Sequence, residues 1–123
     1  MEFDELSNKV IGCAIEVHRN LGPGLLESAY EQCLSYELLQ AGIGHQTQKE
    51  ISVKYKEITL DCGYKADIMV EDKLIVELKA VDKVTPVYEV QILTYMKLTN
   101  IKTGLLINFN VKLLKDGIKR FVL

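Results

Sequence analysis

The sequence predicts an α/β domain in which helices flank a central mixed β-sheet. Two observations support this fold class. Apolar residues recur at steps of three or four through residues 6–21 and 25–40, whereas residues 45–80 alternate with a period of two. The chain has 123 residues, of which 48% are hydrophobic and 26% are charged. Because this is typical of one globular domain, we treat residues 1–123 as a single unit.

Glycine, proline and capping residues mark the ends of the predicted helices. The Gly-Pro-Gly segment 22–24 ends the first helix, because proline lacks an amide donor and glycine allows the turn. Gly42 lies at the expected C-terminal end of the second helix. A third helix is predicted for residues 86–99, with Thr85 as its N-cap, proline in the first position, and Asn100 at its end.

The remaining segments predict strands. Residues 45–80 contain three or four of them, and residues 103–108 (TGLLIN) form another buried strand. The Asp-Gly pair at 116–117 is a hairpin signal, which predicts that a strand at 111–114 continues into one at 118–123. The order helix, helix, strands, helix, strands is that of a sheet covered by helices.

Composition and charge narrow the class of protein. A net charge of −2 and a pI near 5.7 argue against a protein that coats nucleic acid, because such domains are usually basic. Lysine-rich segments at 49–56 and 112–120 are either local binding patches or solvated surface. No apolar run approaches the roughly 20 residues that span a bilayer, and the N-terminus is no signal peptide. We therefore expect no membrane partner and a cytoplasmic location.

Cysteine and histidine do not indicate a zinc site. Cys13, Cys33 and Cys62 form no C-x-x-C pair, and an odd number completes no disulfide framework. We expect them to be small core residues in a reducing compartment. His18 and His45 have no partners at metal-ligand spacing.

The stretch 66–80 (ADIMVEDKLIVELKA) places charges inside two short apolar strands. Burying a charge is costly unless the charge is paired or binds a metal. Strict alternation predicts that Ala66, Ile68 and Val70 share one face of the first strand. The charged residues of both strands then lie on the opposite face.

A hairpin that closes over residues 71–73 would bring two acids together. If the residues flanking this turn pair, the same register places Asp67 directly opposite Glu77, with Cβ atoms roughly 5 Å apart. Lys79 follows one same-face step after Glu77, roughly 6.6 Å along the strand. A shift of one residue would separate the acids onto opposite faces, so the prediction is specific.

Adjacent carboxylates repel each other unless a proton or a cation lies between them. Their oxygens, together with a backbone carbonyl and water, suit a hard divalent ion such as Mg²⁺ or Mn²⁺. A neighbouring lysine could hold or help deprotonate a water molecule. The alternative is a surface ion-pair cluster of Lys79 with Asp67 or Glu77, which would contribute little stability.

These residues and two further motifs resemble the PD-(D/E)XK nuclease superfamily. Its core motif, an acid followed by E-x-K, corresponds to Asp67 and residues 77–79. Residues 91–95 (QILTY) are similar to the Q-x-x-x-Y helix motif of its RecB-like members, and residues 24–30 (GLLESAY) are similar to the signature of its small GxxExxY family. Ala66 stands where the superfamily's name has proline, a position that varies. The resemblance implies a restriction-endonuclease-like core.

The resemblance also implies a metal centre. The ligands would be the carboxylates of Asp67 and Glu77 and the carbonyl of Leu78. Lys79 would position the nucleophilic water and stabilise charge at the phosphate. Glu27 would be the helix-borne acid that approaches the metal, although an acid in a first helical turn is favoured by the helix dipole in any case.

The resemblance implies substrate contacts as well. Gln91 and Tyr95 would line the site beside the scissile strand, and Gln91 would have a catalytic role. Alternatively, the two residues form a local pair at i and i+4. Tyr30 is a further candidate for substrate binding, with a packing residue whose hydroxyl is hydrogen-bonded as the alternative. Tyr64 and Tyr88 are candidates for stacking on bases, or are simply half-buried.

The function implied is metal-dependent hydrolysis of phosphodiester bonds in DNA or RNA, with Mg²⁺ or Mn²⁺ as cofactor. These motifs are compatible with endo- and exonuclease action. The alternative is a non-catalytic module that keeps this fold and binds a nucleic acid or a protein, as the acidic pI and limited surface of a lone domain would favour. Pairing of the C-terminal β-segments with a second copy would give a homodimer.

Overall fold

The computed structural model describes residues 4–123. The elements in chain order are α1 (Glu5–Leu21), α2 (Glu27–Gln40), β1 (His45–Tyr55), β2 (Ile58–Val70), β3 (Leu74–Lys79), α3 (Pro86–Thr99), β4 (Thr103–Asn108), the 3₁₀ turn η1 (Leu114–Gly117) and β5 (Ile118–Val122). Among these residues no helix has the length and apolar character needed to cross a membrane.

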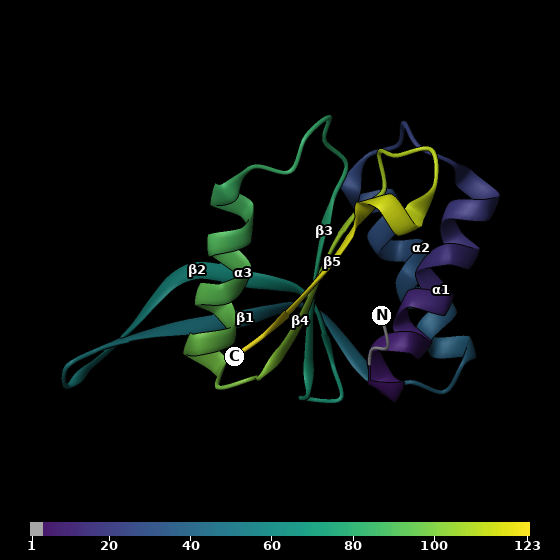
Figure 1. Cartoon of the computed structure of the whole chain (residues 1–123). Coiled ribbons are helices and arrows are strands. Elements are labelled where there is room, and N and C mark those ends of the chain that lie inside the picture. The colour runs from purple at the N-terminus through teal and green to yellow at the C-terminus, as the bar shows by residue number, and fades with distance from the viewer. Residues whose placement is uncertain (1–3) are drawn as a thin grey trace.

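The five strands form one mixed sheet in the order β1-β2-β3-β4-β5. Neighbouring strands are antiparallel except β3 and β4, which are parallel and are joined through α3. In Figure 1, α1 and α2 cover one face of the sheet, α3 covers the other, and the β1–β2 hairpin extends beyond α3. The predicted α/β fold, a central mixed sheet flanked by helices, is confirmed.

The sheet separates two apolar cores. The larger lies under α1 and α2 and includes Tyr30, Leu34, Ile68, Val76 and Phe109, whereas the smaller lies under α3 and includes Ala66, Met69, Ile75, Ile92 and Met96. Strands that contribute to both cores, as β2 and β3 do, are held on two faces, so their positions are well determined.

Local signals predicted correctly both ends of α3 and the C-terminal ends of α1 and α2, whereas α2 begins at Glu27 rather than at residue 25. Helix α3 begins at Pro86 and is closed by Asn100, whose backbone is left-handed with φ 58°. Gly42, after α2, also has a positive φ of 71°, a conformation that costs glycine little. At the start of α1, the Asp4 carboxylate accepts a hydrogen bond of 3.0 Å from the amide of Ser7 and so caps the helix.

The predicted hairpin at residues 116–117 is wrong. Residues 111–113 form no strand; η1 follows them, and β5 instead pairs antiparallel with β4, with Ile107 opposite Ile118. Leu114 turns inward and is buried. Gly117 packs directly against the carbonyl of Asn108, where a Cβ atom would not fit. The segment is therefore a wide connection anchored by packing rather than a two-residue turn.

The cysteines are only partly as predicted. Cys13 and Cys33 are half-buried and pack against the α1–α2 core. Cys62 is exposed on β2, so it is not a core residue. Cys62 belongs to the β1–β2 hairpin, which extends beyond α3 (Figure 1).

Candidate active site

The β2–β3 hairpin closes over residues 71–73 as predicted. The amide of Lys73 donates a hydrogen bond of 2.9 Å to the carbonyl of Val70. Glu71 and Asp72 have φ values of 50° and 52°, as expected for a tight hairpin turn with two left-handed residues. Val70 lies opposite Leu74, so the predicted register is confirmed.

The regular β2–β3 ladder ends one position before the two acids, at the pair Ile68 and Val76. Beyond the pair Ile68 and Val76, side chain-to-backbone hydrogen bonds connect the two strands. The amide of Asp67 donates to Glu77 Oε2 at 3.0 Å, and the amide of Leu78 donates to Asp67 Oδ2 at 2.8 Å. The two acids are therefore brought together by crossed side chain-to-backbone hydrogen bonds.

The side-chain alternation of β2 slips at Asp67. Ile68 and Val70 pack into the α1–α2 core as expected, but Ala66 packs into the α3 core together with Met69. Residues an odd number apart do not share a face in a regular strand. The prediction that Ala66 shares a face with Ile68 is therefore wrong. The regular pairing of β2 with β3 ends at Ile68, and on the neighbouring strand β1 Gln48 has a left-handed backbone.

Glu77 is buried, and within the described part of the chain no cationic side chain forms an ion pair with it. Its side chain is on β3, and the residue is 5% exposed. Burial, and then the negative charge of Asp67, raise the pKa of Glu77 to about 9, against a smaller opposing effect of Lys79. Without a cation, the pair therefore holds one proton at neutral pH.

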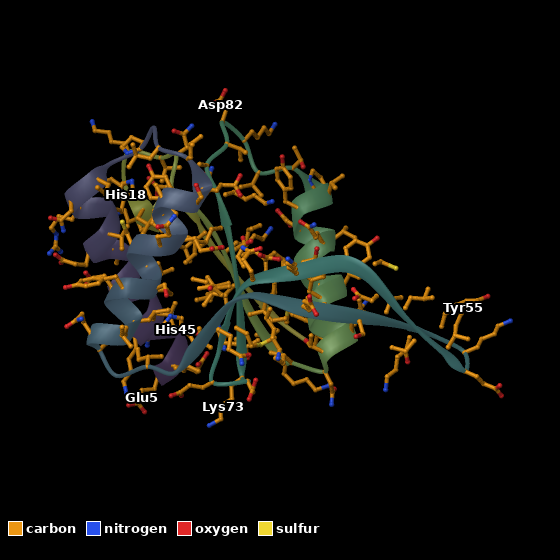
Figure 2. All side chains as sticks on the ribbon, turned by 180° about the vertical axis from the view of Figure 1, so that it is seen from behind. Glu5, His18, His45, Tyr55, Lys73 and Asp82 are labelled. Carbon is orange, nitrogen blue, oxygen red and sulfur yellow. The ribbon has the colours of Figure 1, made fainter. Side chains whose placement is uncertain are left out.

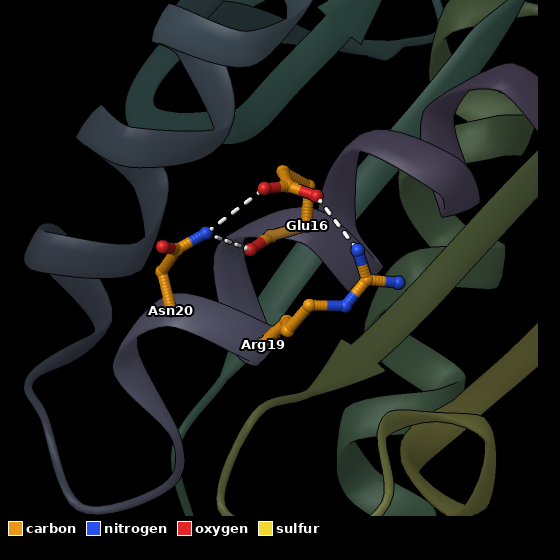
Figure 3. Close-up of polar contacts among 3 residues, drawn as sticks. All are labelled: Glu16, Arg19 and Asn20. Atoms are coloured by element: carbon orange, nitrogen blue, oxygen red, sulfur yellow. Dashed lines mark hydrogen bonds and ion pairs between the residues drawn. The ribbon is translucent and has the colours of Figure 1, made fainter.

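Lys79 is not part of a surface ion-pair cluster. Its Nζ lies 4.4 Å from the ring centroid of Tyr88, and among residues 4–123 no carboxylate is within ion-pair distance of it. Ordinary exposed acids behave differently, as Figure 3 shows on α1. There Glu16 accepts hydrogen bonds from Arg19 at 3.1 Å and from Asn20 at 3.0 Å.

Helix α2 brings two further acids to the site. A cavity of about 300 Å³ beside Asp67 is lined by Glu27, Ser28, Glu31, Gln48, Asp67 and Leu78. Burial raises the pKa of Glu31, and the charges of Asp67 and Glu27 add to this, while a hydrogen bond from Gln48 opposes it. The i, i+4 spacing from Glu27 could have indicated Glu31, whereas nothing in the sequence around Gln48 indicated that residue.

Helix α3 contributes the other wall of the site. The Nε2 of Gln91 donates a hydrogen bond of 3.1 Å to the hydroxyl of Tyr95, so the two residues form the local i, i+4 pair. Burial and the charge of Glu77 raise the pKa of Tyr95, with the bond from Gln91 opposing. Both line a cavity of about 390 Å³ together with Val53, Cys62, Tyr64, Thr94 and Leu98.

Tyr30 is a core residue. It has no exposed surface, and its ring stacks on Phe109 at a centroid distance of 4.4 Å. Its hydroxyl donates to the carbonyl of Gly22 at 2.6 Å and accepts from the amide of Leu25 at 3.1 Å. The geometry fits the packing alternative, since no part of Tyr30 can reach a substrate, and we leave it out of the proposed binding surface.

Comparison with known families decides the assignment. The family model of the PD-(D/E)XK nuclease superfamily matches residues 4–121. The chain belongs to the PD-(D/E)XK nuclease superfamily. Comparisons with curated proteins and with solved structures give no significant match. Membership implies a nuclease-like function and a nucleic-acid substrate.

Nucleases of the PD-(D/E)XK superfamily generally use divalent metals, and the donor atoms here are of the matching kind. Among residues 4–123, no three His, Cys, Asp or Glu side chains form a complete metal site. The pair Asp67 and Glu77 supplies two carboxylates, so the remaining ligands would be a backbone carbonyl, such as that of Leu78, and water. A cation would also offset the burial and the repulsion by Asp67 that raise the pKa of Glu77.

Proposed function

We propose that this chain is a metal-dependent nuclease that hydrolyses phosphodiester bonds in DNA or RNA. One observation carries the proposal: Glu77 is buried against a second acid, Asp67, with a raised pKa, and no cation among residues 4–123 forms an ion pair with it. A protein does not gain stability from such a pair. In a nuclease superfamily, the arrangement is accounted for by a cation that displaces the proton.

In this proposal Asp67, Glu77 and the carbonyl of Leu78 hold Mg²⁺ or Mn²⁺. When bound, the ion supplies Lewis-acid stabilisation of the phosphate and lowers the pKa of the attacking water. Lys79 leaves the face of the Tyr88 ring, a contact of modest strength, to orient that water and stabilise negative charge. Glu27 approaches the same centre from the first turn of α2, where it lines the cavity beside Asp67.

The substrate would lie across α3 and the base of the β1–β2 hairpin. Gln91 and Tyr95 line the cavity there, and the charge of Glu77 already acts on the Tyr95 hydroxyl. Tyr64 is 47% exposed, and its ring centroid lies 6.2 Å from that of Tyr95. An exposed aromatic ring beside the scissile strand supports stacking on a base.

The test is a nuclease assay on single- and double-stranded DNA and RNA with Mg²⁺ or Mn²⁺. Asp67→Ala, Glu77→Ala and Lys79→Ala should each reduce cleavage at least a hundredfold, because electrostatic groups at a reacting phosphate contribute that much or more. Lys73→Ala is the control, since Lys73 lies in the turn of the same hairpin and points outward (Figure 2). Cleavage that all three site variants retain would exclude this mechanism.

A non-catalytic binding module is the second candidate, and one observation favours it. The outer half of the β1–β2 hairpin exposes the large apolar residues Tyr55, Ile58 and Leu60, and Tyr55 lies near its tip, away from both cores (Figure 2). Such exposure suits a partner surface. Thermal unfolding with added Mn²⁺ separates the candidates: the nuclease requires a rise in Tm that Asp67→Asn abolishes.

Finer features of the assignment belong to the same proposal. Residues 24–30 and 91–95 support placing the chain with the GxxExxY and RecB-like members of the superfamily. Residues 1–123 would act as a single domain. Because β5 lies at an edge of the sheet, it could pair with the same strand of a second copy in a homodimer. Light scattering coupled to size-exclusion chromatography would measure the mass and decide this point.

A further inference from the structure

Gln48 has a strained backbone in the first half of β1. Its φ is 53°, a left-handed conformation that L-residues other than glycine and asparagine rarely adopt. The flanking pairs of the β1–β2 ladder are regular, with Thr47 opposite Ile68 and Lys49 opposite Ala66. Gln48 is therefore the residue that faces Asp67 across the ladder, at the position where the alternation of β2 also slips.

The side chain of Gln48 connects two acids. Its Nε2 donates a hydrogen bond of 2.5 Å to Glu31 Oε1 and makes a longer one of 3.4 Å to Asp67 Oδ1. The other oxygen of Asp67 accepts from the amide of Leu78. Each oxygen of the Asp67 carboxylate thus has one donor, and the amide group separates Asp67 from the like charge of Glu31.

We infer that Gln48 is a positioning residue: anchored on Glu31, it orients the Asp67 carboxylate toward the proposed cation site. A strained backbone persists at functional sites when the surrounding contacts hold it in place. Here the left-handed backbone directs the side-chain amide of Gln48 between the carboxylates of Glu31 and Asp67. Without that donor, Asp67 would lose one of its two hydrogen bonds and turn away from Glu31. The inference rests on the proposed function, because orientation matters only if Asp67 binds a cation.

The test variant is Gln48→Gly, which removes the amide and adopts the left-handed backbone without strain. Its matched control is Lys56→Gly, because Lys56 has nearly the same φ, 52°, in the β1–β2 turn, far from the site. Both variants relieve similar backbone strain, so each should unfold at a temperature equal to or above that of the wild type. Gln48→Met, which has a side chain of similar length but no donor and no charge, is the second test variant.

Two measurements report on orientation. In cation-free protein, hydrogen exchange at the Leu78 amide should be about tenfold faster in both Gln48 variants, because its acceptor Asp67 is no longer held. The affinity for Mn²⁺, measured by electron paramagnetic resonance, should fall about 10- to 100-fold, as is typical when a residue that orients a metal ligand is lost. Lys56→Gly should match the wild type in both measurements.

Unchanged Leu78 exchange in the Gln48 variants would overturn the inference, and so would an unchanged affinity for Mn²⁺. If the wild type bound no Mn²⁺ at all, the proposed function would fail instead. Exchange at Leu78 would then still decide whether Gln48 orients Asp67, so the two failures are distinguishable.

Discussion

Replacing Glu77 with glutamine should change how the stability of the protein depends on pH. In the folded state the pKa of Glu77 is raised to about 9 by burial and by the charge of Asp67, whereas its ordinary value is 4.5. Between these values the unfolded chain releases the proton and the folded protein keeps it. The folded state therefore binds more protons, and its stability falls as the pH rises through this window.

The magnitude follows from one proton. A difference of one bound proton changes the free energy of unfolding by about 1.4 kcal/mol per pH unit. From pH 6 to pH 8 the wild type should thus lose about 2–3 kcal/mol through Glu77 alone. Glu77→Gln has no proton to release, so this component of the slope should disappear, and the variant should be more stable than the wild type at pH 8.

Urea denaturation at several pH values between 6 and 8 measures this effect, and the difference between wild type and variant isolates Glu77 from other titrating groups. Adding Mn²⁺ to the wild type should flatten its slope, because a cation-bound Glu77 is already ionised. If the free energy of unfolding changed with pH equally in the wild type and in Glu77→Gln, Glu77 would be ionised in the folded protein. The argument that Asp67 and Glu77 share one proton would then fail.

Four further substitutions test the fold and the role of Tyr30. Burial raises the pKa of Asp4, but hydrogen bonds in the first turn of α1 lower it to about 2. Asp4→Ala should therefore lower the free energy of unfolding by about 1 kcal/mol at pH 7. Urea denaturation should show this difference vanish as the pH falls from 3.8 toward 2. In Gly104→Ala the new Cβ meets the side chains of Met96 and Ile92, so the substitution should lower stability by about 1–3 kcal/mol. Gly117→Ala meets the backbone carbonyl of Asn108 and should lower the Tm further. Tyr30→Phe should cost about 1–3 kcal/mol yet leave nuclease activity intact; loss of activity without loss of stability would return Tyr30 to the substrate surface.

Local chemistry was sufficient for the features that depend on neighbouring residues in the chain. Proline at the first position of α3 and Asn100 at its end predicted both of its limits, because capping and proline geometry act within one turn. Alternation on both sides of residues 71–73 predicted the register that brings Asp67 near Glu77. These patterns repeat along the backbone and can be read without knowledge of the packing.

The same reasoning failed where distant segments decide the geometry. The Asp-Gly pair at 116–117 indicated a turn, but the strand that β5 joins was β4, chosen by the burial of Leu114 and the close approach of Gly117 to Asn108. Gln48 looked like one polar residue among many on β1. Its backbone reversal and its contacts with acids on α2 and β2 exist only in the folded chain.

By itself, the sequence determined the limits of α3 and the hairpin register that brings Asp67 near Glu77, because capping and periodicity are properties of the local chain. Tertiary structure alone decided that Glu77 would be buried and hold a proton, that Lys79 would rest on Tyr88, and that α2 would bring a further acid, Glu31, to the site. The physical reason is that solvation and side-chain partners depend on which segments pack together. A residue's own neighbours in sequence do not set them.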